Sequence, residues 1–186
     1  MKANTSNHLK KKYQIKHFYK IIFILTILSL IPLKKASASC GLFKVVKNDV
    51  QYKKQGKTKY RKARKNKKVC TGDSVKTGVN SRATVQLAGG DEIYFSPETE
   101  ILVSELETES IHKKVLLDVI KGKLRSSVKN KYKDNGKSHY RVRTQSAVAG
   151  VRGTDFLAGF NQSTGQSEIV TFHGEVAVGP NAGGSY

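Results

Sequence analysis

The chain has 186 residues, of which 34 are lysine or arginine and 14 are aspartate or glutamate, so its formal net charge is +20. This length suits one domain with a short additional segment. A hydrophobic content of 38% excludes a wholly disordered tail, and three prolines and two cysteines exclude collagen-like and disulfide-scaffold classes.

The positive charge is concentrated in two segments. Residues 1–38 contain eight lysines and no acidic residue, and residues 44–68 contain twelve lysines and arginines against Asp49 alone. From residue 69 onward, 14 basic residues are nearly balanced by 13 acidic ones. The body of the domain is therefore almost neutral, and the basicity is local.

The N-terminal segment predicts a signal peptide. A lysine-rich region at 2–20 precedes the apolar run 21–33, and small residues follow up to Ala38. The apolar run is shorter than the roughly 20 residues that a membrane-spanning helix requires. We expect cleavage between Ala38 and Ser39 and export to the periplasm or cell envelope. Membrane attachment would then require an uncleaved signal or a lipid on Cys40.

The two cysteines, Cys40 and Cys70, allow three interpretations. In an oxidising compartment they would form one disulfide, which stabilises the fold by about 3–4 kcal/mol. Alternatively, Cys40 carries the acyl group of a lipoprotein, although Ser37 stands where a large aliphatic residue is usual. The third interpretation is two unpaired thiols. Two cysteines without clustered histidines offer too few ligands for zinc.

From residue 69 onward, apolar and polar residues alternate in short segments. Ala83, Val85 and Leu87 share one face of a segment that ends at the glycine turn 89–91. Similar segments continue to residue 178, and a short helical stretch is conceivable only within 101–117. The pattern predicts an all-β domain whose strands of five to seven residues are joined by glycine-containing turns.

Four ordered motifs resemble the FecR domain family. Residues 70–87 are similar to its opening "G-D-x-(aliphatic)-x-T-G-x-x-S-x-A", and residues 89–95 to the strand pair that follows. Residues 147–156 resemble its "A-V-x-G-V-R-G-T-x-F" segment, and residues 174–178 its terminal "G-x-V-x-V" strand. The positions of these motifs that we expect to have structural roles are Gly72, Asp73, Thr77, Gly78, Arg152, Gly153, Thr154 and Gly174.

The resemblance implies an extracytoplasmic β-domain, a twisted β-solenoid or β-roll of short strands. We expect a signal peptide at 1–38, first strands and a basic loop at 39–68, the FecR-like domain at 69–179 and a tail at 180–186. Residues 41–68 would form a variable first hairpin. Sensors of this family in iron–siderophore uptake also carry a cytosolic anti-sigma domain and a piece that contacts an outer-membrane transducer. Because only twenty residues precede Ile21 and eight follow Val178, we expect a standalone module.

Arg152 and Asp73 are the most prominent polar residues of the motifs. Arg152 could present its guanidinium to an anionic ligand, but Asp155 follows three positions later. We therefore favour a bidentate bond from Arg152 to a carboxylate or to strand-end carbonyls, which would fix the turn. Asp73 is expected to fix a turn through nearby backbone amides.

No catalytic, cofactor-binding or metal-binding residue is predicted. The histidines of the expected mature chain, His112, His139 and His173, are widely separated and lack metal-site spacing. The acidic run 98–109 is typical of a solvated strand edge. The sequence contains no nucleophile-elbow or phosphate-loop motif.

The basic stretch 53–68 is a candidate for binding polyanions. Its lysines and arginines alternate with Tyr60 and follow Tyr52, an arrangement that suits phosphate contacts combined with stacking. Export favours lipopolysaccharide-like polyanions over nucleic acid as ligands. The candidate contact residues are Lys62, Arg64, Lys65, Lys67 and Lys68.

These observations predict an exported, FecR-like, non-catalytic interaction module of the bacterial cell envelope, with a protein partner. One alternative is a periplasmic sensor component of a sigma-regulator system. Another is an envelope protein that binds polyanions through residues 53–68.

Overall fold

Alternating apolar residues produce β-strands throughout the part of the chain that the computed structural model describes, residues 39–108, 111–132 and 137–181. The expected signal peptide, 1–38, therefore lies outside the described residues. Those described belong to one unit that runs from Ala38 to Tyr186. They contain no helix, so the all-β prediction is confirmed. Among them, no helix is long and apolar enough to cross a membrane.

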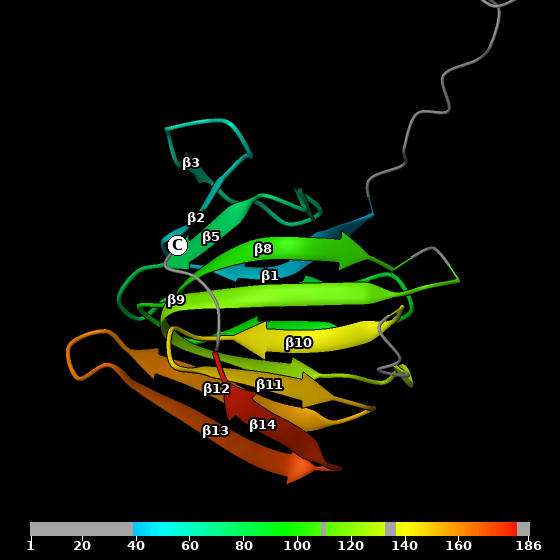
Figure 1. Ribbon diagram of the computed structural model, residues 1–186. Helices are drawn as coiled ribbons and strands as arrows, with labels where there is room; N and C mark the ends of the chain where they lie inside the picture. Colours follow the sequence, from blue (N-terminus) through cyan, green and yellow to red (C-terminus); the bar gives the residue numbers. More distant parts are fainter. Residues whose placement is uncertain (1–38, 109–110, 133–136, 182–186) are drawn as a thin grey trace, which may run out of the picture. The chain divides into compact units, whose positions relative to one another are not determined.

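Fourteen strands are formed within the described residues (Figure 1). They are β1 (Cys40–Lys47), β2 (Val50–Lys53), β3 (Arg61–Lys62), β4 (Lys68–Cys70), β5 (Ser74–Thr77), β6 (Arg82–Gln86), β7 (Glu92–Phe95), β8 (Glu100–Glu107), β9 (Lys114–Ser127), β10 (His139–Arg143), β11 (Ala147–Val151), β12 (Asp155–Asn161), β13 (Gln166–His173) and β14 (Val176–Pro180). The helical stretch conceivable within 101–117 is not formed. Its apolar residues alternate with period two on β8 and β9 and reach the core as strand residues.

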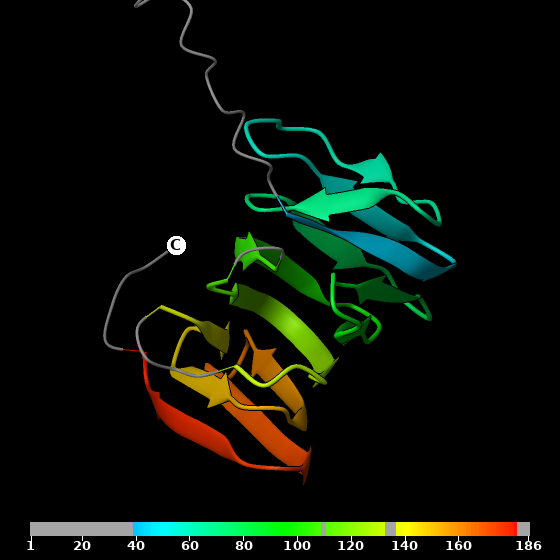
Figure 2. The same cartoon turned by 90° about the vertical axis from the view of Figure 1, so that its right-hand side faces the viewer.

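The strands form one curled sheet with two arms that share β9 (Figures 1 and 2). Arm A has the order β4-β1-β6-β7-β9-β12-β13. Arm B has the order β3-β2-β5-β8-β9-β10-β11-β14. Neighbouring strands are antiparallel except for β9 and β10, which are parallel. β1 and β2 lie in different arms, and the antiparallel pair within the expected first hairpin at 41–68 is β2 with β3.

Gly122 allows β9 to belong to both arms. Residues before it pair with β8 and β10, and residues after it pair with β7 and β12. Gly122 has a φ of +82°, and an added Cβ would lie 2.6 Å from the Thr99 Cα and 2.7 Å from the Glu98 carbonyl oxygen. Both conditions require glycine at this position. The curl of the sheet thus depends on one residue in its longest strand.

The core lies between the two arms. Inward-facing residues of both arms are almost fully buried, among them Phe43, Val85 and Leu124 from arm A and Val75 and Ile101 from arm B. Ala83, Val85 and Leu87, which were predicted to share one face, are all buried. Rings from different segments meet edge to face, with centroids 6.3 Å apart for Phe43 and Tyr52 and 6.4 Å apart for Tyr140 and Phe156.

Candidate interaction surfaces

One row of side chains crosses the outer face of arm A. The strand registers place six residues opposite one another on neighbouring strands, and the sequence neighbours of the four central ones are buried. We call this set the outer row: Val45, Thr84, Tyr94, Arg125, Leu157 and Val170. Val45, Tyr94 and Val170 are exposed large hydrophobic residues of the row. The row therefore combines apolar surface with one central cation.

Arg125 is held in a defined orientation at the centre of the outer row. Its Nε donates to Asp155 Oδ1 at 2.7 Å, and its Nη2 donates to Asp155 Oδ2 at 2.6 Å. The guanidinium carbon lies 4.9 Å from the ring centroid of Phe172 and 5.9 Å from that of Tyr94. Half of the Arg125 side chain nevertheless remains exposed. The group is ordered by its neighbours and still accessible to a partner.

The hydrogen bonds of this cluster shift the titration of its members. The hydrogen bonds from Arg125 lower the pKa of Asp155, and the same contact raises the pKa of Arg125. The Tyr94 hydroxyl donates to Glu92, and this bond raises the pKa of Tyr94. Asp155 is thus kept ionised and Arg125 protonated, so the pair persists over a wide pH range.

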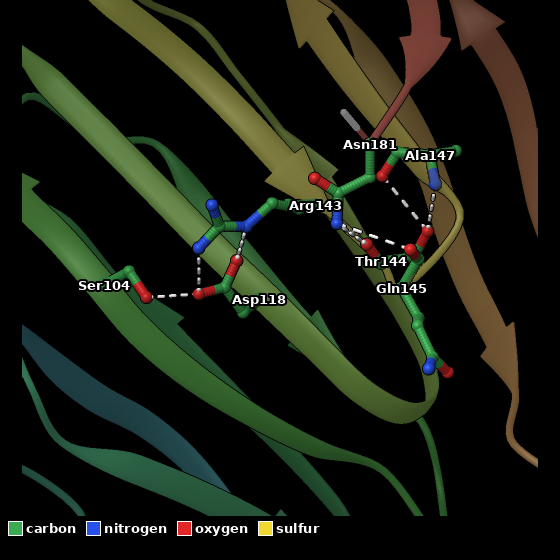
Figure 3. Close-up of polar contacts among 7 residues, drawn as sticks. All are labelled: Ser104, Asp118, Arg143, Thr144, Gln145, Ala147 and Asn181. Carbon is green, nitrogen blue, oxygen red and sulfur yellow. Dashed lines mark hydrogen bonds and ion pairs between the residues drawn. The ribbon is translucent and has the colours of Figure 1, made fainter. Parts of the chain in front are cut away.

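A second ion pair, on arm B, is buried and has a structural role. Arg143 of β10 donates from Nε and Nη2 to the two carboxylate oxygens of Asp118 on β9, at 2.6 and 2.9 Å. Ser104 of β8 donates to the same carboxylate, as Figure 3 shows. The side chain of Asp118 is 1% exposed. The pair therefore ties together three strands at the one parallel junction among the described strands.

The end of β10 is also connected to the end of the described chain. Thr144 Oγ1 donates to the Ala147 carbonyl oxygen at 3.1 Å and accepts from the Ala147 N–H at 2.9 Å, which closes the turn after β10. Asn181 Nδ2 donates to the Thr144 carbonyl oxygen at 3.0 Å (Figure 3). These contacts anchor the residue that follows β14 to this turn.

Asp73 fixes the turn between β4 and β5. It is 2% exposed and accepts from the Cys70 N–H at 2.9 Å, in agreement with its expected role. It also accepts from the Gln55 N–H at 3.1 Å and from the Lys54 ammonium at 2.5 Å. Gly72, beside it, has a φ of +80°. The ties to residues 54 and 55, which anchor the start of the basic loop, were not visible in the sequence motif.

The remaining motif residues have structural positions. Thr77 Oγ1 donates to the Ser96 carbonyl oxygen at 2.6 Å, and Gly78 leaves only 3.1 Å between an added Cβ and the Asp49 carboxylate. Thr154 Oγ1 donates to the Glu175 carbonyl oxygen at 3.0 Å. Gly153 and Gly174 both have positive φ, at +65° and +82°.

The expected role of Arg152 is not supported. Its side chain is exposed, and no hydrogen bond or ion pair connects it to the rest of the described chain. The nearby Asp155 instead binds Arg125, which comes from a strand 30 residues earlier in the chain. Side chains alternate along a strand, so Asp155 lies on the same outer face as Leu157, and Leu157 is the residue directly opposite Arg125.

A disulfide joins Cys40 to Cys70 and leaves no free cysteine. The first of the three interpretations is therefore the one that the structure contains. The bond connects the beginning of β1 to the end of β4, two strands that pair in arm A. It closes the segment that carries the basic loop.

The basic loop retains its charge but lacks the expected stacking surface. Its candidate contact residues, Lys62, Arg64, Lys65, Lys67 and Lys68, are all exposed. Between them, Ala63 is buried and its N–H donates to the Val50 carbonyl oxygen at 2.8 Å. Tyr52 is only 5% exposed and belongs to the core, so it cannot stack on a ligand.

Tyr60 is engaged within the protein. Its hydroxyl donates to Glu100 Oε1 at 2.8 Å, and burial, together with this bond, raises the pKa of Tyr60 to about 12. The Lys76 ammonium lies 4.1 Å from the ring centroid, and the Lys53 ammonium lies 5.2 Å from it. Any anion would therefore meet cations rather than a free aromatic face.

The acidic run lies partly at a free strand side. β9 pairs along most of β8, whereas β5 pairs only with residues 100–102, so Glu105 and Glu107 have a strand partner on one side only. His139 has a carboxylate neighbour, since its Nε2 lies 2.9 Å from Glu105 Oε2. Within the described ranges, however, no three His, Cys, Asp or Glu residues form a group that could hold a metal ion.

Comparison with known proteins agrees with the motifs. Residues 73–177 match the family model described as FecR protein. Neither the curated proteins nor the solved structures contain a significant match. The matched segment covers more than half of the chain and runs from the Asp73 turn to β14. The chain therefore belongs to the FecR family, whose domain is known from sigma-factor regulatory signalling proteins that are typically periplasmic or membrane-associated.

Proposed function

We propose that the protein is an exported, non-catalytic binding module of the cell envelope that docks a partner protein on the outer row of arm A. The observation that carries this proposal is the Arg125 cluster, in which a half-exposed guanidinium is oriented by Asp155 and flanked by Tyr94 and Phe172. Arginine and tyrosine are enriched among the residues that contribute most of the binding free energy at protein interfaces.

The outer face of arm A has the composition of a docking surface. The outer face of an antiparallel sheet is usually polar when it faces water. Here Val45 is 50% exposed, Phe172 is 55% exposed and Val170 is 37% exposed on the same face as Arg125. Because the Arg125 side chain is already ordered, this residue would lose little side-chain entropy when a partner binds there.

Membership of a family known from signalling supports a protein partner rather than a substrate. Such docking would suit a periplasmic sensor component of a sigma-regulator system.

The Cys40–Cys70 disulfide supports export, since disulfides persist in oxidising compartments. We place the start of the mature chain at Ser39. We also propose that the chain, which repeatedly passes between the arms, is a form of β-roll.

The docking proposal can be tested with a photo-crosslinking amino acid at Tyr94 of the full chain in intact cells of its source. We expect a discrete crosslinked species that disappears when Arg125 is replaced by Gln. The same probe at Val79, an exposed turn residue, is the positional control, and Arg152→Gln is the matched control for loss of an exposed arginine. Equal crosslinking from both positions, or insensitivity to Arg125→Gln, would contradict docking on the outer row.

A second candidate function is polyanion binding by the basic loop, favoured by its five exposed lysine and arginine side chains. Such binding would depend on counterion release and weaken steeply with salt. For heparin or lipopolysaccharide, we expect a log–log slope steeper than about −3. Replacing the five candidate residues with Gln should reduce that slope while leaving the thermal midpoint within about 2–3 °C. Unchanged binding would mean that the loop only contributes solubility.

A further inference from the structure

Arm A ends in a strand edge that lacks the usual protection. β13 pairs only with β12 among the described strands, and six of its eight residues are exposed. The sequence of β13 contains no proline, lysine or arginine, and its one acidic residue, Glu168, forms an ion pair with Lys123 at 2.6 Å. The pairing with β12 is regular from Thr171 to Gln166. Such an edge offers unpaired N–H and C=O groups to another strand.

The opposite ends of the two arms are protected. There the edge strands are β3 and β4, which are only two and three residues long. They carry the exposed side chains of Arg61, Lys62 and Lys68. Short strands and exposed cations are the devices by which proteins prevent pairing between edges. The contrast points to the end of the sheet that carries β13 and β14 as the place where pairing is possible.

Exposed apolar side chains accompany the β13 edge. Val170 and Phe172 of β13 are 37% and 55% exposed, and Val178 of β14 is 56% exposed. β14 is the free edge of arm B, so both arms end in apolar strands at the same end of the curled sheet (Figure 1). Phe172 is only partly covered, by the Arg125 guanidinium on one ring face.

We propose that the protein forms a two-fold symmetric homodimer in which β13 pairs with β13 of a second copy in antiparallel orientation. The register that we infer places Val170 opposite Val170 of the copy. In this register Phe172 lies opposite Glu168, and Ile169 lies opposite Thr171. Outer-face residues then meet outer-face residues, as the period of two in a strand requires. The interaction is self-complementary, as a two-fold interface must be.

The distribution of charge favours a second copy as the occupant of this edge. The formal net charge of +20 would oppose association if it were spread evenly. Residues 44–68, however, supply eleven net positive charges to the β3 and β4 end, whereas residues from 69 onward are almost neutral. Pairing through β13 keeps the two basic loops at the far ends of the dimer, where separation beyond the screening length removes their repulsion.

The oligomeric state of the full-length chain tests this proposal. In sedimentation velocity over about 2–200 µM, the range expected for a modest interface, we expect a concentration-dependent dimer. Val170→Lys places a charge at the centre of the pairing and should give a monomer whose thermal midpoint stays within about 2–3 °C, because the site is exposed. A monomeric wild type, or a Val170→Lys protein that dimerises equally well, would overturn the proposal.

Single-cysteine variants test the register, because both natural cysteines are in the disulfide. Directly opposite Cβ atoms are about 4.5–5.5 Å apart, within reach of a disulfide. Val170→Cys should therefore give a covalent dimer under mild oxidation. Phe172→Cys is the matched control, because its two copies would be about 13 Å apart. A mixture of Phe172→Cys and Glu168→Cys should crosslink instead. Equal crosslinking of the two single variants would refute the register and the symmetric edge.

Discussion

Replacing Arg143 with methionine removes the cation of the buried ion pair while keeping much of the side-chain volume. Asp118, with a side chain only 1% exposed, would lose both hydrogen bonds from Arg143 and retain the one from Ser104. Removing one partner of a buried pair leaves an uncompensated charge and typically costs about 3–5 kcal/mol. Because Arg143 is 29% exposed, water can partly solvate the carboxylate, so we expect about 3 kcal/mol.

Arg125→Met is a matched control. Arg125 makes the same bidentate contact with Asp155, but the two side chains are 50% and 24% exposed. Exposed ion pairs contribute up to about 1 kcal/mol, so this variant should be destabilised by no more than that. For a domain of this size, the expected shift of the thermal midpoint is about 6–12 °C for Arg143→Met and at most about 4 °C for Arg125→Met.

Urea titration of the three proteins would measure the free energies of unfolding, with unchanged m-values required for the comparison. The double variant Arg143→Met with Asp118→Leu should recover much of the lost stability, because an apolar pair leaves no buried charge. If Arg143→Met and Arg125→Met cost the same, or if the double variant is the least stable of all, burial does not control the contribution of these pairs.

Three further predictions concern other parts of the fold. Gly122→Ala should cost more than about 2 kcal/mol in denaturant titration, because it combines a positive φ with a backbone clash. Asp155 should titrate by NMR at a pH below the ordinary range, and Arg125→Gln should return it to that range. Since the folded-state pKa is lowered, this contribution to stability is present above the unfolded pKa and disappears as the pH falls through the folded pKa. Replacing Cys40 and Cys70 with Ser should cost about 2–4 kcal/mol, and alkylation of the native protein should detect no free thiol.

The local pattern of the sequence was sufficient for several features. A period of two determines which side chains share a face, so the inward placement of Ala83, Val85 and Leu87 followed directly. The turn at Asp73 was also predictable, because an aspartate after glycine accepts from amides close to it in the chain. The family resemblance rested on such local motifs, and the match over 73–177 confirmed it.

Other features depended on which strands become neighbours. The prediction for Arg152 failed because its supposed partner, Asp155, binds Arg125 of the neighbouring strand β9. The sequence also did not reveal that β5 covers only residues 100–102 of the acidic run, whereas Glu105 and Glu107 pair with β9 alone.

The Arg125 cluster and the open edge of β13 have the same origin in tertiary structure. Alternation along the chain determines that a side chain points outward, but its partners come from strands that are distant in sequence. Which residues meet on the outer face depends on how the sheet curls about Gly122. The bend at this residue divides the strands that pair with β9 between the two arms. The sequence by itself thus determined the strands and their buried faces. Only the tertiary structure decided which outward side chains form a surface, because strand order and register result from packing the whole domain.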